Sequence, residues 1–182
     1  MQLGKLTTRY IAKEDRFLIS AETDRGNINL WLTQRLLKSL LPHLLEWLEA
    51  QTPPEQAASA SLPAAEGQNS GAIPAQNLTP SPQVASQLVA QTQPPVTQVD
   101  AAAASESTLV QTIQFQPRGG TLRLIFELPD EPALLMLQPE HLRIWLGALY
   151  TGWQQADWPD LWPDWMKQAQ RLRSQHSSAL IH

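Results

Sequence analysis

Residues 29–49 have the sequence NLWLTQRLLKSLLPHLLEWLE, and this stretch decides the fold. Leu30 and Leu32 alternate with their neighbours, which is typical of a strand, whereas the leucines that follow recur at the spacing of a helix. Thr33 stands between the two patterns, and its hydroxyl can accept a hydrogen bond from a free N–H group of the first helical turn. The stretch therefore predicts a strand that runs directly into a helix ending near Ala50.

The predicted helix is too apolar to have only one buried face. Its polar residues form a narrow stripe, and nearly every other position is leucine or tryptophan. A helix on a protein surface usually carries a single apolar stripe, so we expect this one to be covered on two sides. Pro42 lies inside it and removes the N–H group that would bond to the Lys38 carbonyl, which predicts a kink. The polar stripe consists of Arg35, Ser39, His43, Glu46 and Glu49.

Two further alternating segments precede this stretch. Apolar residues alternate with polar ones over residues 3–12 and again from Phe17 to Ala21, and a polar turn follows each segment. In the second turn, Gly26 and Asn27 can adopt the positive φ angles of a tight turn. Turns this short join neighbouring antiparallel strands. The start of the chain therefore predicts a three-stranded meander followed by a helix, which we call a βββα module.

The same pattern returns 105 residues later. Residues 109–137 contain three alternating segments separated by turns, and Pro139 follows them. Because proline is favoured at the first position of a helix, we expect a second helix that begins there and ends near Gln155. Gly147 and Gly152 weaken its middle and its end.

Internal duplication explains this repetition better than chance does, because turn lengths and the strand-to-helix junction coincide along with the apolar positions. Leucine matches alone would be weak evidence in a leucine-rich chain. The equivalent pairs are Phe17 and Leu122, Ile19 and Leu124, Ala21 and Phe126, Leu30 and Leu135, Leu32 and Leu137, Leu37 and Leu142, Leu40 and Trp145, Leu41 and Leu146, Leu44 and Leu149, Leu48 and Trp153, and Tyr10 and Phe115.

The predicted architecture is α+β, with two βββα modules packed together and an extra C-terminal helix. The first module spans residues 1–50, and the second spans residues 109–182. Residues 51–108 between them are rich in Ala, Gln, Pro and Ser and contain no aromatic side chain. Such a segment buries too little apolar surface to offset its ordering entropy, so we expect a disordered linker. Short apolar pieces such as residues 84–89 could dock onto a partner, although isolated apolar residues in such segments are usually solvated.

Each module needs a cover for the excess apolar surface of its helix. A three-stranded sheet with one helix makes a marginal core at about 50 residues, and the other module is the expected cover. Helix can pack on helix, or the two sheets can join edge to edge. Either arrangement can form within one chain or by exchange between two chains, because a linker of this length restrains neither.

Five of the seven tryptophans lie between residues 145 and 165, where a Trp-Pro-Asp unit occurs twice. Proline and aspartate both suit the start of a helix, so we expect a helix from about Pro163 to Gln175. The tryptophans have two interpretations. They cap the core of the second module, or they form an exposed anchor for a partner, since tryptophan is enriched at binding hot spots. The candidate partner-binding residues are Trp47, Trp158, Trp162 and Trp165.

The sequence contains no recognisable catalytic or metal-binding motif. The four histidines have no metal-ligand spacing, and the absence of cysteine excludes disulfides, thiolate metal sites and cysteine nucleophiles. The net charge is +1 over residues 1–50 and −1 over residues 109–182, so no clustered basic surface for nucleic acid is present. We therefore expect no catalytic residues, no metal site, no cofactor and no nucleic-acid partner.

The chain has no apolar run long enough for a signal peptide or a membrane span, which predicts a cytoplasmic protein with no membrane insertion. We expect a non-enzymatic protein–protein interaction or assembly factor, an adaptor that binds a protein partner or a second copy of itself. Its apolar helix faces and its tryptophan-rich end would make the contact. The alternative is a small-molecule-binding or catalytic domain, with a pocket between the sheet and the tryptophan-rich helices. Enzymatic activity thus stays open as the alternative.

Overall fold

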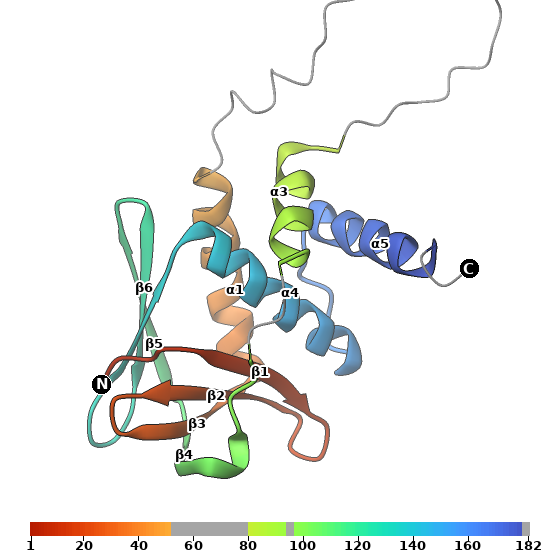
Figure 1. The fold of residues 1–182 in the computed structure, drawn as a ribbon. Coiled ribbons are helices and arrows are strands. Elements are labelled where there is room, and N and C mark those ends of the chain that lie inside the picture. Colours follow the sequence, from red (N-terminus) through yellow and green to blue (C-terminus); the bar gives the residue numbers. More distant parts are fainter. Residues whose placement is uncertain (52–79, 94–96, 180–182) are drawn as a thin grey trace, which may run out of the picture.

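The computed structural model describes residues 1–51, 80–93 and 97–179, and it has the α+β architecture that the sequence predicts (Figure 1). The described residues form a four-stranded sheet, a three-stranded sheet and four α-helices. In Figure 1 the helices gather on one side of the four-stranded sheet, which is drawn at the bottom. No helix among the described residues is long and apolar enough to cross a membrane.

The first meander and its helix form as predicted. Strands β1 (Leu6–Ile11), β2 (Arg16–Thr23) and β3 (Gly26–Thr33) pair in antiparallel order. Helix α1 (Gln34–Ala50) follows β3 without a connecting loop. The hydroxyl of Thr33 caps this helix by accepting a hydrogen bond from a first-turn N–H group at 3.3 Å. The predicted role of Thr33 is therefore confirmed.

The second meander repeats this order. Strands β5 (Thr112–Arg118), β6 (Thr121–Glu127) and β7 (Ala133–Leu137) pair in antiparallel order. Helix α4 (Pro139–Gln155) follows β7 and begins at the predicted proline. Helix α5 (Asp164–Ala179) is the extra helix that the sequence predicts after the second module.

The chain between the two meanders contains more regular structure than the sequence predicts. Helix α3 (Pro82–Gln91), a short 3-10 helix (Ala101–Ala103) and strand β4 (Ala104–Leu109) lie largely within residues 51–108, where we expect a disordered linker. β4 runs parallel to β3 and is held by backbone hydrogen bonds, which need no apolar alternation. This difference explains why the sequence pattern misses it. Residues 52–79 of the predicted linker lie outside the described residues.

The second hairpin has the same register in both modules. Leu18 pairs with Trp31 in the first sheet, and Arg123 pairs with Met136 in the second. Each residue of the second pair lies 105 positions after its counterpart in the first pair. The offset found in the sequence therefore holds for backbone pairing as well as for apolar character.

The segment just before the first strand of each meander pairs with the sheet of the other meander. In the first sheet, Ser107 of β4 stands opposite Asn29 of β3 in a parallel pairing. In the second, Gln2 stands opposite Leu134 of β7, again in parallel and again at the 105-residue offset. Leu109, expected to open the first strand of the second module, instead ends a strand of the first sheet.

The first strands depart from the 105-residue offset. Thr8 pairs with Ile19, and Phe115 pairs with Leu124, the residue equivalent to Ile19. Phe115 therefore corresponds to Thr8, and the predicted match of Tyr10 with Phe115 is wrong by two residues. The cause is the turn between the first two strands, which is two residues shorter in the second module.

α1 and α4 each pack against a strand of their own module and a strand of the other module. α4 packs against β1 as well as β7, and α1 packs against β5 as well as β3. The buried side chains of both modules form one hydrophobic cluster. The helix positions that match at the 105-residue offset, from Leu37 and Leu142 to Leu48 and Trp153, are all buried. This packing accounts for helices that are apolar on two sides.

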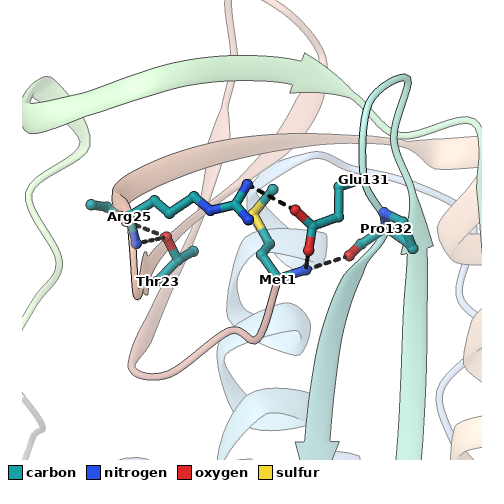
Figure 2. Close-up of polar contacts among 6 residues, drawn as sticks. Met1, Thr23, Arg25, Glu131 and Pro132 are labelled. Carbon is teal, nitrogen blue, oxygen red and sulfur yellow. Dashed lines mark hydrogen bonds and ion pairs between the residues drawn. The ribbon is translucent and has the colours of Figure 1, made fainter.

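The start of the chain links a turn of each module (Figure 2). The amino group of Met1 donates to the Glu131 carboxylate and, at 2.9 Å, to the Pro132 carbonyl. Nη1 of Arg25 lies 2.9 Å from the other oxygen of Glu131. The adjoining backbone bonds to β7, where the Leu134 N–H donates to the Met1 carbonyl at 2.9 Å. One carboxylate therefore holds both the first residue and the turn between β2 and β3.

Replacing Glu131 with glutamine should loosen this end of the second sheet. The hydrogen bond from the Met1 amino group, together with the charge of Arg25, holds the pKa of Glu131 below its ordinary value of 4.5. A carboxylate whose pKa is lowered by folding stabilises the folded state at any pH above its ordinary pKa. This stabilisation is lost as the pH falls through the lowered pKa. At pH 7, hydrogen exchange at Leu134 should be faster in Glu131→Gln than in wild type or in the neighbouring control Asp130→Asn. Equal rates in all three chains would show that the contact contributes nothing.

Candidate functional site

Six aromatic rings from both modules form one cluster. Trp153 at the end of α4 stands at its centre, with ring centroids 5.0 Å from Trp158 and 5.8 Å from Trp162, both edge to face. Trp158 also contacts Phe17 of β2 at 5.4 Å. Edge-to-face pairs at these distances have the geometry that aromatic quadrupoles favour. The cluster consists of Tyr10, Phe17, Tyr150, Trp153, Trp158 and Trp162.

Hydrogen bonds hold the rim of this aromatic cluster. Oδ1 of Asp15 accepts from the Trp158 indole N–H at 2.8 Å and from the Tyr10 hydroxyl at 2.7 Å. The bond to Asp15 raises the pKa of Tyr10 above its ordinary value. Trp153 donates its indole N–H to the Pro159 carbonyl at 3.0 Å. The loop after α4 is thereby tied to the first turn of the other module.

Three of the four candidate partner-binding tryptophans lie inside the protein. Trp47 is 7% exposed, Trp158 is 9% exposed and Trp162 is 3% exposed. Trp165 is half-buried and donates its indole N–H to Oε1 of Glu49 at 2.7 Å, which ties α5 to α1. The burial agrees with the core-capping interpretation. Partner binding by these four residues stays a prediction, and exposure lends support only to Trp165.

A glycine stands where the first module meets α4. A Cβ atom built on Gly152 would lie 2.5 Å from Cε1 of Phe17, 2.8 Å from its Cζ and 3.2 Å from Cβ of Tyr10. Real Cβ atoms essentially never come within 3.0 Å of a heavy atom that belongs to a residue distant in the chain. Gly152 weakens the end of α4 as a helix, but the lack of a side chain there lets Phe17 of β2 pack against α4.

A cleft of about 870 Å³ opens beside the aromatic cluster. Lys167 lines it with Nζ 2.6 Å from Oδ2 of Asp160, and this hydrogen bond lowers the pKa of Asp160 and raises that of Lys167. In the described part of the chain, no group of three or more His, Asp or Glu side chains could hold a metal ion. The lining comes from α4, the following loop and α5, whereas the sequence predicts a pocket against a sheet. The lining residues are Tyr150, Trp153, Gln154, Asp157, Trp158, Pro159, Asp160, Lys167, Gln170, Arg171, Ser174 and Gln175.

An apolar row crosses the face of the four-stranded sheet that is turned away from the helices. Leu18, Trp31 and Leu109 stand opposite one another on β2, β3 and β4. Leu109 is 40% exposed, and Trp31 is half-buried with its indole N–H donated to the Ser107 hydroxyl at 2.8 Å. The sequence does indicate that Trp31 lies on the opposite face of its strand, because it alternates with the buried Leu30 and Leu32. Our sequence-based list of candidate residues omits it.

β4 is the last strand of its sheet, and within the described ranges no strand pairs with its outer edge. A hollow beside it is lined by Glu106, Ser107 and Thr108 together with Met1 and the turn at residues 128–131. An unpaired edge strand presents free N–H and C=O groups that can pair with an extended segment of another chain. This edge, with Trp31 and Leu109 next to it, is the candidate binding surface.

Comparison with protein-family models, with curated proteins and with solved structures finds no match for this chain. No relative assigns a role to any of these residues, so their own chemistry and placement are the support for a function.

Proposed function

We propose that this chain is a non-enzymatic protein–protein interaction or assembly factor that binds an extended partner segment along β4. The observation that carries the proposal is the unpaired outer edge of β4 beside the exposed Leu109. Strand addition at such an edge supplies backbone hydrogen bonds for affinity, and the neighbouring side chains supply specificity. Trp31 is one such neighbour, and tryptophan is among the residue types enriched at binding hot spots.

We also infer that the two modules arose by duplication of one βββα unit and that the protein acts in the cytoplasm. Two backbone pairings support the duplication, since Leu18–Trp31 and Arg123–Met136 have the same register, and the parallel pairings of β3 and β7 follow the same offset. The two modules then resemble two subunits of a symmetric dimer joined in one chain. The cytoplasmic location rests on the sequence alone.

Leu109→Asp should weaken partner binding at least about ten-fold, because loss of a hot-spot side chain typically costs more than about 1.4 kcal/mol. Leu161→Asp is the matched control, since Leu161 is 39% exposed against 40% for Leu109 but lies on the loop before α5. A photo-cross-linking residue at position 109, and separately at position 161, identifies the partner in cells. Calorimetry then compares its affinity for wild type and both aspartate variants.

Cross-links from position 161 but none from position 109 would contradict the proposed surface, as would equal affinities of Leu109→Asp and Leu161→Asp. A cross-link from position 109 to a second copy of this chain would identify self-association through two β4 edges. Thermal unfolding of each variant before the binding measurement separates a lost contact from a lost fold.

Small-molecule binding is the second candidate function, and the cleft between α4 and α5 is the observation that favours it. Clefts of this size accommodate small ligands, and Lys167 and Asp160 offer polar groups within it. A thermal-shift screen against metabolites and nucleotides distinguishes the two functions. A saturable shift in the wild-type chain that Lys167→Ala abolishes would favour the cleft.

A further inference from the structure

α3 presents three glutamines at four-residue spacing to the rest of the protein. Gln83, Gln87 and Gln91 lie along one side of this helix, because residues four apart share a face. α3 packs against α4 and α5, and Gln87 is completely buried there. A row of uncharged polar side chains costs free energy to bury unless each finds a hydrogen-bond partner. The contacts of the row therefore show what the surface beneath it recognises.

The three glutamines contact two residues of α4 that lie one helical turn apart, Arg143 and Gly147. The side chain of Gln87 donates to the Arg143 carbonyl at 2.9 Å. The Arg143 guanidinium donates to the Gln83 backbone carbonyl at 3.4 Å and to its Oε1 at 2.5 Å. A Cβ atom built on Gly147 would lie 3.1 Å from Nε2 of Gln91. Glycine at this position therefore lets α3 approach α4 closely.

Among the described residues, nothing covers the equivalent face of α1 in this way. Arg143 and Gly147 correspond at the 105-residue offset to Lys38 and Pro42, and both of these are exposed. The buried positions of the two helices otherwise match closely. Within residues 1–51, 80–93 and 97–179, the covered surface around Arg143 and Gly147 therefore has no counterpart on α1, and the shared fold does not require it.

The fit of α3 on this surface is incomplete. Oε1 of Gln87 and both amide atoms of the Gln91 side chain are buried, with no hydrogen-bond partner among the described residues. The buried apolar side chains of α3 are only Val84 and Ala90, and Val89 is 66% exposed. A helix this short is marginal by itself in water, and unpaired buried amides weaken its docking. Release of α3 would also break no strand pairing, because α3 belongs to neither sheet.

We propose that the surface of α4 and α5 beneath α3 is a helix-binding site, which α3 occupies in the free protein and from which a partner helix displaces it. The partner is an uncharged helix with glutamine at positions i and i+4, equivalent to Gln83 and Gln87. Its chemistry follows from the site, since Arg143 offers a carbonyl acceptor and guanidinium donors, which carboxamide groups match. Gly147 admits close approach of the partner helix. The inference rests on the proposed role in protein interaction and adds a second surface, separate from β4.

The probe is a fluorescein-labelled peptide of residues 80–93, added to the full chain and followed by anisotropy. In the wild-type chain α3 competes for the site, and an occupied site lowers the apparent affinity of an added ligand. Val84→Asp should release α3 and tighten peptide binding at least ten-fold. Ala85→Asp is the matched control, because Ala85 is an exposed residue of the same helix, and it should bind the peptide as wild type does. Adding Gly147→Leu to Val84→Asp should abolish binding.

Equal peptide binding by the Val84→Asp and Ala85→Asp chains would overturn the proposal, because α3 would then not occupy the peptide's site. So would undiminished binding of a peptide with Gln83 and Gln87 changed to alanine, because these two residues make the hydrogen bonds to Arg143. Hydrogen exchange in the wild-type chain is an independent check, in which α3 amides should exchange at least ten-fold faster than α4 amides, and equal protection would contradict displacement. Partner binding at β4 is measured with the Leu109 variants, so failure of either surface leaves the result for the other intact.

Discussion

Replacing Gly152 with alanine should lower the stability of the chain by roughly 1–3 kcal/mol, the usual cost of forcing an extra methyl group into a packed core. Helix propensity alone would raise the stability by about 1 kcal/mol, because alanine is the better helix former. The packing term is larger because the new Cβ would stand 2.5 Å from a carbon of Phe17. That ring is fully buried and packs between Tyr10 and Trp158, so it has no free direction to move. Denaturant unfolding followed by tryptophan fluorescence measures the change.

Gly120→Ala is the matched control for Gly152→Ala. No atom lies within 4 Å of the Cβ position of Gly120, and its φ angle is not in the left-handed region, so stability should change by no more than about 0.5 kcal/mol. Combining Gly152→Ala with Phe17→Leu should cost less than the sum of the two single changes, because neighbouring sites couple. A Gly152→Ala chain as stable as wild type would show that β2 and α4 are not in tight contact.

Cutting the chain within residues 52–79 should give two fragments that fold only together. Residues 1–51 lack β4, and residues 80–182 lack the segment that pairs with Leu134. Each fragment also loses the helix that covers its sheet from the other side, and the exposed apolar surface is an aggregation liability. We expect each fragment alone to be insoluble. Co-expressed, they should run as one complex at micromolar concentration, which implies a binding free energy of at least about 8 kcal/mol.

A single hydrogen bond between the fragments tests the geometry of this complex. Trp145 donates its indole N–H to the Thr8 hydroxyl at 3.0 Å, and Trp145 is buried. Thr8→Val would leave that N–H without its acceptor, which typically costs about 1–3 kcal/mol, so fragment affinity should fall by roughly five- to 150-fold. Thr121→Val is the control, because the Thr121 hydroxyl donates to the Arg118 carbonyl within its own hairpin turn and this bond does not join the fragments. Two monomeric fragments with no affinity for each other would contradict the shared core.

The alternation of apolar and polar residues predicts those strands that bury one face against a helix. Ile19 and Leu124 are both fully buried, and they occupy equivalent positions in β2 and β6. The helix starts are predictable because Thr33 and Pro139 each suit a helix N-terminus for a local reason. The second hairpin keeps its register because a slip of one residue would turn every apolar side chain of a strand outward.

The elements that the sequence does not predict are held by other forces. β4 has the sequence ASESTL and is bound through its backbone, whereas α3 is bound through Gln87 and its neighbours. The candidate site shows a related ambiguity. Trp158 carries a large apolar ring and one N–H donor, which suit both a core and an interface. Its contacts with Phe17, Trp153 and Asp15, which lie far from it in the sequence or depend on the fold, decide for the core. Trp31 is the better-marked case, because its phase in β3 places it on the face away from the helices.

The parallel pairing of β3 with β4 cannot form on the ribosome until β4 has been synthesised. Synthesis proceeds from the amino terminus at about 5–20 residues per second, so β3 is complete on the order of 10 s before β4 emerges. Contacts at such sequence separation also form slowly. During that interval the edge of β3 that later pairs with β4 and the side of α1 that later packs against β5 are both exposed. Nascent copies on neighbouring ribosomes of one message present the same open edge, so strand exchange between newly made chains competes with closure of each chain on itself.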